Sequence, residues 1–238
     1  MNRNLLGILT LVGVGMALIV GLAIAGSRPS NGQTLPVQTA PVQVAQVQVA
    51  QVQVAQTATL PPIADLLADR VLGNPNAPVT ILDYSSMTCP HCATFHTETL
   101  PKIKEKYIDT GKAKLVFRDF PFDQAALRAS MLARCAPPER YYPLLDVLFK
   151  SQAQWSRASD PAKALAQYGK LAGMSQETID ACMASQPLAD GILQSRMVGA
   201  DKYKVEATPT FVLNDGAATI SGAQSFETFA AAIDKLVK

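Results

Sequence analysis

Two of the four cysteines in this 238-residue chain are separated by only two residues, in the segment Cys89-Pro90-His91-Cys92. Two thiols at this spacing can close a small disulfide ring and exchange it with the thiols of other molecules. The apolar residues 79–84, typical of a buried strand, precede the pair, and a helical pattern begins at Pro90. The sequence therefore predicts a redox-active pair where a strand passes into a helix.

The start of a helix favours an ionised thiol at Cys89. Free backbone N–H groups and the positive end of the helix dipole stabilise a thiolate there. Pro90 at the first helical position costs no hydrogen bond, and a protonated His91 adds positive charge beside the sulfur. Cys92 lies one turn further along, so we expect it to be enclosed and to resolve the mixed disulfide. A stabilised Cys89 thiolate favours the reduced form and makes the disulfide a stronger oxidant.

A zinc site and an inert structural disulfide are the alternatives for this segment. Structural zinc needs four ligands, usually in two closely spaced pairs. The other cysteines, Cys135 and Cys182, stand alone, and His96 is the one further histidine that zinc could recruit. We therefore expect redox chemistry with no metal and with no cofactor besides the Cys89–Cys92 disulfide.

The N-terminal quarter of the chain differs in composition from the rest. Residues 5–25 carry no charge and are long enough to cross a bilayer as a helix. They end in Ala23-Ile24-Ala25, a pattern that a signal peptidase can cut. We expect a signal anchor or signal peptide over residues 1–26, with membrane contact through residues 5–25 if it is not cleaved. Either segment places the body outside the cytoplasm, in the periplasm or an equivalent compartment.

A repeat of Val-Gln-Val-Ala-Gln follows within residues 27–61. A five-residue period builds a constant apolar face in neither a helix nor a strand, so the segment predicts a low-complexity linker. An oligomerisation segment is the alternative, because uncharged Val/Gln-rich strands can pair with one another.

The folded body is predicted over residues 62–238. The 21 basic residues of the chain nearly balance the 19 acidic ones and form no basic stripe, which argues against nucleic acid as a partner. The order of elements predicts an α/β, thioredoxin-like sheet with a helical insertion at about residues 123–205. The predicted helices outside the insertion cover residues 63–70, 90–107 with a kink at Pro101, and 226–237; the predicted strands cover 79–84, 114–117, 210–213 and 217–220.

Residues 70–238 resemble the DsbA-type thiol:disulfide oxidoreductases of the thioredoxin superfamily. The resemblance rests on the Cys-Pro-His-Cys segment at a strand–helix junction, the helical insertion, and Ala207-Thr-Pro-Thr-Phe211 at the start of a strand. It implies that Pro209 is cis and faces the active-site pair, and that the backbone of Thr208 pairs with an extended substrate chain. Without the resemblance, Thr208-Pro209 would be a simple turn into a strand.

The resemblance also implies that Asp83, six residues before Cys89, is the buried acid that assists proton transfer to Cys92. The alternative is an exposed strand acid. The prototype oxidase has valine before the cis-proline, whereas Thr208 is typical of the isomerase and reductase branches. This departure leaves the direction of electron flow open.

Cys135 and Cys182 are additional to the prototype, and helical periodicity places both toward the helical core. Two buried free thiols are one possibility. Outside the cytoplasm a structural disulfide is favoured, and similar second bridges occur in some DsbA-like proteins.

The expected function is that of an oxidase which introduces disulfides into secreted or periplasmic proteins. Its substrates would be unfolded or partly folded proteins with free cysteines, and a membrane redox partner would reoxidise the site. The alternatives are an isomerase or reductase that a membrane thiol relay keeps reduced, and a non-catalytic periplasmic chaperone.

Overall fold

The computed structural model of the chain describes residues 59–237. The predicted signal segment, residues 1–26, and nearly all of the predicted linker, residues 27–61, lie outside the described residues. Among residues 59–237, every helix is too short or too polar to cross a bilayer.

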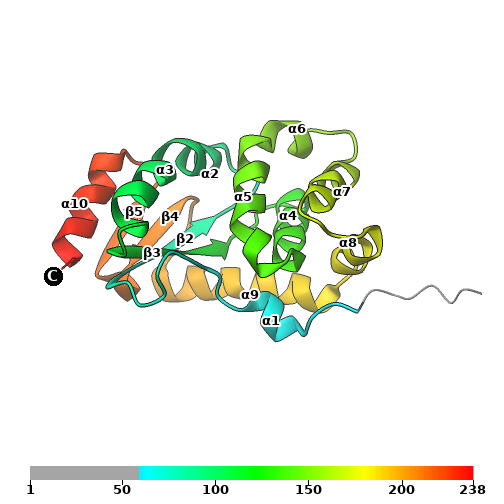
Figure 1. Cartoon of the computed structure of the whole chain (residues 1–238), viewed down its shortest axis with the longest axis horizontal. Coiled ribbons are helices and arrows are strands. Elements are labelled where there is room, and N and C mark those ends of the chain that lie inside the picture. The colour runs from blue at the N-terminus through cyan, green and yellow to red at the C-terminus, as the bar shows by residue number, and fades with distance from the viewer. Residues whose placement is uncertain (1–58, 238) are drawn as a thin grey trace, which may run out of the picture. The chain divides into compact units, whose positions relative to one another are not determined.

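A five-stranded mixed sheet forms the centre of the body, in the order β1-β3-β2-β4-β5 (Figure 1). Strands β2 and β3 are parallel, and each of the other neighbouring pairs is antiparallel. This arrangement confirms the predicted thioredoxin-like α/β fold. The strands are β1 (Val71–Leu72), β2 (Val79–Ser85), β3 (Ala113–Asp119), β4 (Thr210–Leu213) and β5 (Ala218–Ser221).

Strand β2 lies in the centre of the sheet, and its apolar side chains pack into two hydrophobic cores, one on each face. Ile81 faces the larger core, whereas Leu82 and Tyr84 face a smaller one on the other side of the sheet. Alternation along a strand sends successive side chains to opposite faces, so a strand buried on both faces reads as a continuous apolar run. The same alternation places Asp83 on the side of the larger core, next to the helix that follows.

Helices cover both faces of the sheet. Helix α9 runs along one face, while α2, α3 and α10 lie on the other and α4 to α8 gather beyond one end (Figure 1). Gly199 lets α9 approach closely, because a Cβ there would lie 2.5 Å from Cε1 of Tyr84. The helices are α1 (Ile63–Leu67), α2 (Pro90–Thr94), α3 (Leu100–Ile103), α4 (Gln124–Cys135), α5 (Tyr141–Lys150), α6 (Gln152–Ser156), α7 (Pro161–Leu171), α8 (Gln176–Met183), α9 (Gln186–Tyr203) and α10 (Phe226–Leu236).

Side-chain caps begin α4, α7, α8 and α9 of the insertion and the closing helix α10. Asp123 accepts a hydrogen bond from the backbone N–H of Ala126 at 2.7 Å, and Asp160 accepts one from Lys163 at 3.0 Å. Such caps satisfy backbone donors that have no partner within the helix. Serine side chains do the same at the starts of α8, α9 and α10.

The structure differs from the predicted elements in two places. The helix predicted over residues 63–70 ends at Leu67, and Val71–Leu72 pair with β3 as a short edge strand. Around Pro101 the helical pitch also changes, since π-helical turns at Phe95–Thr99 and Lys104–Ile108 flank α3. The N–H of Leu100 bonds to the carbonyl of Phe95, five residues back, which accommodates a proline that has no N–H of its own.

Candidate active site

Cys89 occupies the N-cap position of helix α2, with extended backbone angles (φ −78°, ψ 120°) and with Pro90 as the first helical residue. Its carbonyl accepts the first helical hydrogen bond, from the N–H of Ala93 at 3.1 Å. The side-chain amide of Gln152, from helix α6, donates to the carbonyls of Met87 and Cys89, both at 2.9 Å. The helix start and the insertion therefore hold this turn from two sides.

Several hydrogen bonds lower the pKa of the half-buried Cys89 thiol from its ordinary 9.0 to about 5. The largest contribution is a hydrogen bond from the Cys92 thiol. Burial opposes it, and the Thr208 hydroxyl and the backbone N–H groups of Cys92 and His91 add to it. Each donor stabilises the anion more than the neutral thiol, so each favours ionisation. Near neutral pH this sulfur is a thiolate in the dithiol form.

Cys92 has the opposite environment. It is fully buried, and burial raises the pKa of its thiol far above the ordinary value, with the hydrogen bond to Cys89 as the next cause. The pair thus combines an accessible thiolate with an enclosed thiol that keeps its proton.

His91 is exposed, and its contribution to the lowered pKa of Cys89 comes through the backbone N–H. The first turn of a helix points its free N–H groups at the N-cap residue, which accounts for this contribution. The further effect of a protonated His91 ring stays a prediction.

The peptide bond between Thr208 and Pro209 is cis, and it brings the loop before β4 against Cys89. The Cys89 thiol donates to the Thr208 carbonyl, with 3.4 Å between sulfur and oxygen. In this arrangement the buried Thr208 hydroxyl has no hydrogen-bond partner within residues 59–237. It is therefore available to donate to the sulfur when Cys89 ionises, which accounts for its part in lowering the pKa.

Asp83 is completely buried, and its charge acts on the Cys92 thiol. The Ser85 hydroxyl donates to its Oδ1 at 2.5 Å, and its Oδ2 lies 2.8 Å from Nε2 of His96. The ring of His96 stacks on Phe149, with 4.0 Å between centroids and 15° between planes. A buried acid thus has a buried base as its partner.

Cys135 and Cys182 are joined by a disulfide between helices α4 and α8, with 6.2 Å between their Cα atoms. Both side chains are buried among apolar residues of the insertion. Within residues 59–237, no three His, Cys, Asp or Glu side chains gather as they would around a metal ion.

Three polar residues of the site escaped sequence reasoning. The sequence suggested His96 as a zinc ligand or an ordinary surface or core residue, although its position four residues after Cys92 places it on the same side of the helix. Ser85 lies two residues after Asp83 on the same strand face, which was a usable signal. No sequence signal pointed to Gln152, because it reaches the site from a helix, 63 residues beyond Cys89.

The fold and this geometry define a thioredoxin-fold protein with an asymmetric Cys-x-x-Cys pair beside a cis-proline. A thioredoxin family profile matches residues 66–235. The crystal structure of alpha-DsbA1 from Wolbachia pipientis is 34% identical and superimposes with a TM-score of 0.65 over 71% of this chain and 90% of that one. The chain belongs to the thioredoxin family, in its DsbA-type branch.

Curated relatives carry related names. A Rickettsia bellii protein named as a protein-disulfide oxidoreductase is 33% identical over 171 residues, which are 71% of this chain and 65% of that protein. Disulfide bond formation protein D of Bacillus subtilis is 28% identical over 61% of this chain and 67% of its own length. The chain spans slightly less than two thirds of the Rickettsia relatives that it matches.

Proposed function

We propose that the chain is a thiol:disulfide oxidoreductase that introduces disulfides into proteins outside the cytoplasm through Cys89 and Cys92. The observation that carries the proposal is the contrast between the two thiols. Cys89 is accessible and has a pKa of about 5, whereas the pKa of the buried Cys92 is raised. Only Cys89 is accessible to a large substrate. When the Cys89–Cys92 bond breaks, the Cys92 sulfur is the one that must take up a proton.

The exchange follows from this contrast. A substrate thiolate attacks Sγ of Cys89, the Cys89–Cys92 bond breaks, and Cys92 takes the electron pair and then a proton. The second substrate thiolate attacks the substrate sulfur of the mixed disulfide, and Cys89 leaves as a thiolate. The substrate dithiol is oxidised and the enzyme disulfide is reduced, so the electrons balance.

The cis-proline loop supports substrate docking beside Cys89. Thr208 is half-buried, and its carbonyl already reaches the sulfur. An extended substrate chain that pairs with this backbone would bring its own sulfur to Cys89. The proposed substrates are unfolded or partly folded proteins with free cysteines.

The low pKa of Cys89 favours the oxidase direction. A thiolate that is stable at neutral pH stabilises the dithiol form, so the disulfide readily accepts electrons. Thr208 stands before the cis-proline, where threonine is typical of isomerases and reductases. An isomerase or reductase is therefore the second candidate function.

The Cys135–Cys182 disulfide supports a location outside the cytoplasm, because thiols stay reduced inside it. The uncharged residues 5–25 support export by a signal peptide or anchor. Each turnover leaves the enzyme reduced, so an oxidase also needs a reoxidant. A quinone-linked membrane protein is the proposed partner.

A trapping experiment tests the mechanism. The Cys92→Ala variant should accumulate mixed disulfides between Cys89 and cysteine-containing proteins, because the enclosed thiol that releases them is gone. Cys89→Ala is the matched control and should trap nothing. Absence of adducts from Cys92→Ala under oxidising conditions would count against the mechanism.

Thiol alkylation of the protein in its native compartment tests the direction. A mainly oxidised Cys89–Cys92 pair supports an oxidase, and a mainly reduced pair supports an isomerase or reductase. Full function in a variant with serine at both positions would instead indicate the non-catalytic chaperone.

A further inference from the structure

A chain of buried polar side chains leads away from Cys92. Cys92 is completely buried, and the Ser85 hydroxyl is near enough to lower the pKa of its thiol against the larger, opposite effect of burial. The same hydroxyl lies 2.5 Å from Oδ1 of Asp83, and Oδ2 of Asp83 lies 2.8 Å from Nε2 of His96. Ser85 and Asp83 have no exposed surface, and His96 is 5% exposed. The mechanism above uses neither Ser85 nor His96.

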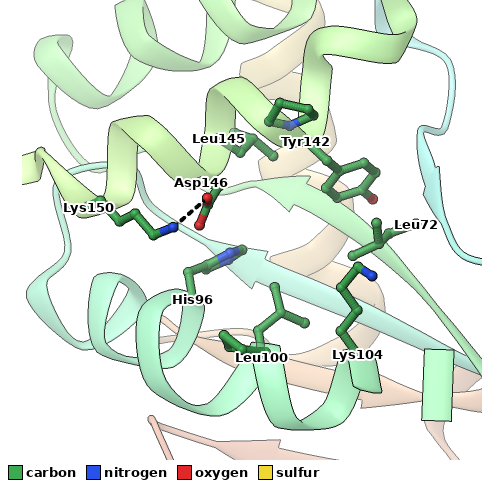
Figure 2. A pocket seen from close by; sticks show the side chains of 10 residues that line it. Leu72, His96, Leu100, Lys104, Tyr142, Leu145, Asp146 and Lys150 are labelled. Atoms are coloured by element: carbon green, nitrogen blue, oxygen red, sulfur yellow. Dashed lines mark hydrogen bonds and ion pairs between the residues drawn. The ribbon is translucent and has the colours of Figure 1, made fainter. Parts of the chain in front are cut away.

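The chain ends at a pocket whose lining includes His96 but neither Cys89 nor the cis-proline loop. His96 lies in the lining of this pocket, which has a volume of about 380 Å³ (Figure 2). The ring points from its helix into the space beneath α5, and within residues 59–237 only Asp83 hydrogen-bonds it. Apolar side chains line most of the remaining wall, among them Leu72, Leu100 and Leu145.

Charged and titratable groups surround the mouth of the pocket. The ion pair between Lys150 and Asp146 is 2.7 Å long and spans its edge on α5 (Figure 2). The groups that face His96 from the neighbouring elements are Asp83 of β2, Tyr142, Asp146 and Lys150 of α5, and Lys104 of the π-helical turn after α3.

We propose that Ser85, Asp83 and His96 form a proton path between Cys92 and solvent in this pocket. The inference rests on the proposed function, because Cys92 changes its protonation in each cycle. When a large partner is bound to Cys89, it covers the face of the site that carries the cis-proline loop. A path through the back of the site lets the proton move while that partner stays bound.

The proton balance of the reoxidation step follows. In the mixed disulfide between Cys89 and an oxidant, the Cys92 thiol passes its proton to the Ser85 oxygen as Ser85 passes its own to Asp83. The Cys92 thiolate attacks the Cys89 sulfur, the new disulfide forms, and the oxidant leaves as a thiolate with the electron pair. Asp83 passes the proton to Nε2 of His96, and Nδ1 releases one to solvent. During substrate oxidation the same path runs in reverse and protonates Cys92.

Oxidation of the reduced full-length chain by glutathione disulfide tests the path. The rate of attack by Cys89 depends on the concentration of glutathione disulfide. The attack of Cys92 on the resulting mixed disulfide, which closes the Cys89–Cys92 ring, is first-order. Samples quenched with a thiol-alkylating reagent at successive times therefore resolve the two steps. In His96→Gln, which keeps a hydrogen bond to Asp83 but carries no transferable ring proton, closure should slow by about 100-fold or more at neutral pH. Ser85→Ala should slow the same step. Attack by Cys89 should keep its rate in both variants.

Chemical rescue separates proton transfer from a structural role. In His96→Ala, imidazole from solution can enter the pocket, and it should restore closure in proportion to its neutral fraction. Lys104→Gln, at the rim of the pocket, is the matched control and should close at the wild-type rate with or without imidazole.

The outcomes are distinct. Wild-type closure in Ser85→Ala and His96→Gln, or a slowed His96→Ala variant that imidazole does not restore, overturns the path. If the His96 variants fail to fold, the rate of closure in Ser85→Ala alone tests the path. This variant removes a single oxygen atom and should therefore fold. A wild-type protein whose Cys89 does not attack glutathione disulfide refutes the proposed function instead.

Discussion

Removing the hydroxyl of Thr208 should raise the pKa of the Cys89 thiol. Thr208→Val keeps the shape of the side chain and takes away a hydroxyl donor that can meet the Cys89 thiolate. In this structure the pKa is lowered from 9.0 to about 5, and the Thr208 hydroxyl is one of the causes. The variant thus tests a hydrogen bond that only the ionised state makes.

The magnitude follows from the strength of such a bond. A hydrogen bond to a charged group contributes about 1.5–3 kcal/mol, and one pKa unit corresponds to about 1.36 kcal/mol. The expected rise is therefore about 1–2 units. Because Cys89 is half-buried and solvent screens its charge, we expect a value near the lower end. A less stable thiolate destabilises the reduced form, so the disulfide should become less oxidising by about 30 mV per pKa unit.

Two measurements check this prediction. The ultraviolet absorbance of the thiolate, titrated against pH in the reduced protein, gives the pKa, and equilibration with glutathione gives the redox potential. Thr219→Val, on the exposed edge of β5, is the matched control and should change neither quantity. An unchanged titration in Thr208→Val would show that the hydroxyl does not reach the sulfur and would refute the reasoning.

Three further predictions concern stability. In the reduced protein, the folded pKa of Cys89 lies below its unfolded value, so the thiolate stabilises the fold. This stabilisation is complete above about pH 9 and is lost as the pH falls through about 5. The raised pKa of Cys92 affects stability only at a pH above its unfolded pKa. Between those limits the free energy of unfolding of the reduced protein should rise with pH relative to that of the oxidised protein, and parallel melting scans that show no pH-dependent difference would contradict this. Replacing Cys135 and Cys182 by alanine should lower the free energy of unfolding by about 4 kcal/mol, since their 47-residue separation closes a long loop, and urea titration measures it. Gly199→Ala should cost about 1–3 kcal/mol in the same assay, because the new methyl group overlaps a buried ring, and unchanged stability would show that α9 can shift away.

The proton path and the thiolate address different halves of one reaction. Cys89 needs no proton carrier near neutral pH, because it is already ionised in the dithiol form. Cys92 keeps its proton until it attacks, and it is enclosed on the side where a partner binds. Variants of Thr208 should therefore alter the redox potential, whereas variants of His96 should alter the rate of ring closure.

Local patterns alone predicted much of the fold. The apolar run of β2, the proline that opens α2 and the Asn214-Asp-Gly216 turn between the last two strands are decided by side-chain chemistry within a few residues. The turn adopts positive φ at all three positions, which this composition favours. Edge strand β1 escaped prediction because its two residues are a strand only through their pairing with β3.

The same division holds for the site. The sequence by itself determined that Cys89 would sit at a helix start, since strand, proline and spacing are all local. Only the tertiary structure decided the rest: that Cys89 donates to the carbonyl of Thr208, 119 residues away, that the backbone N–H of His91 acts on the sulfur, and that Asp83 meets a histidine in the core. A hydrogen bond between distant segments depends on the packing of the elements that carry them, and no local pattern in the chain encodes that packing.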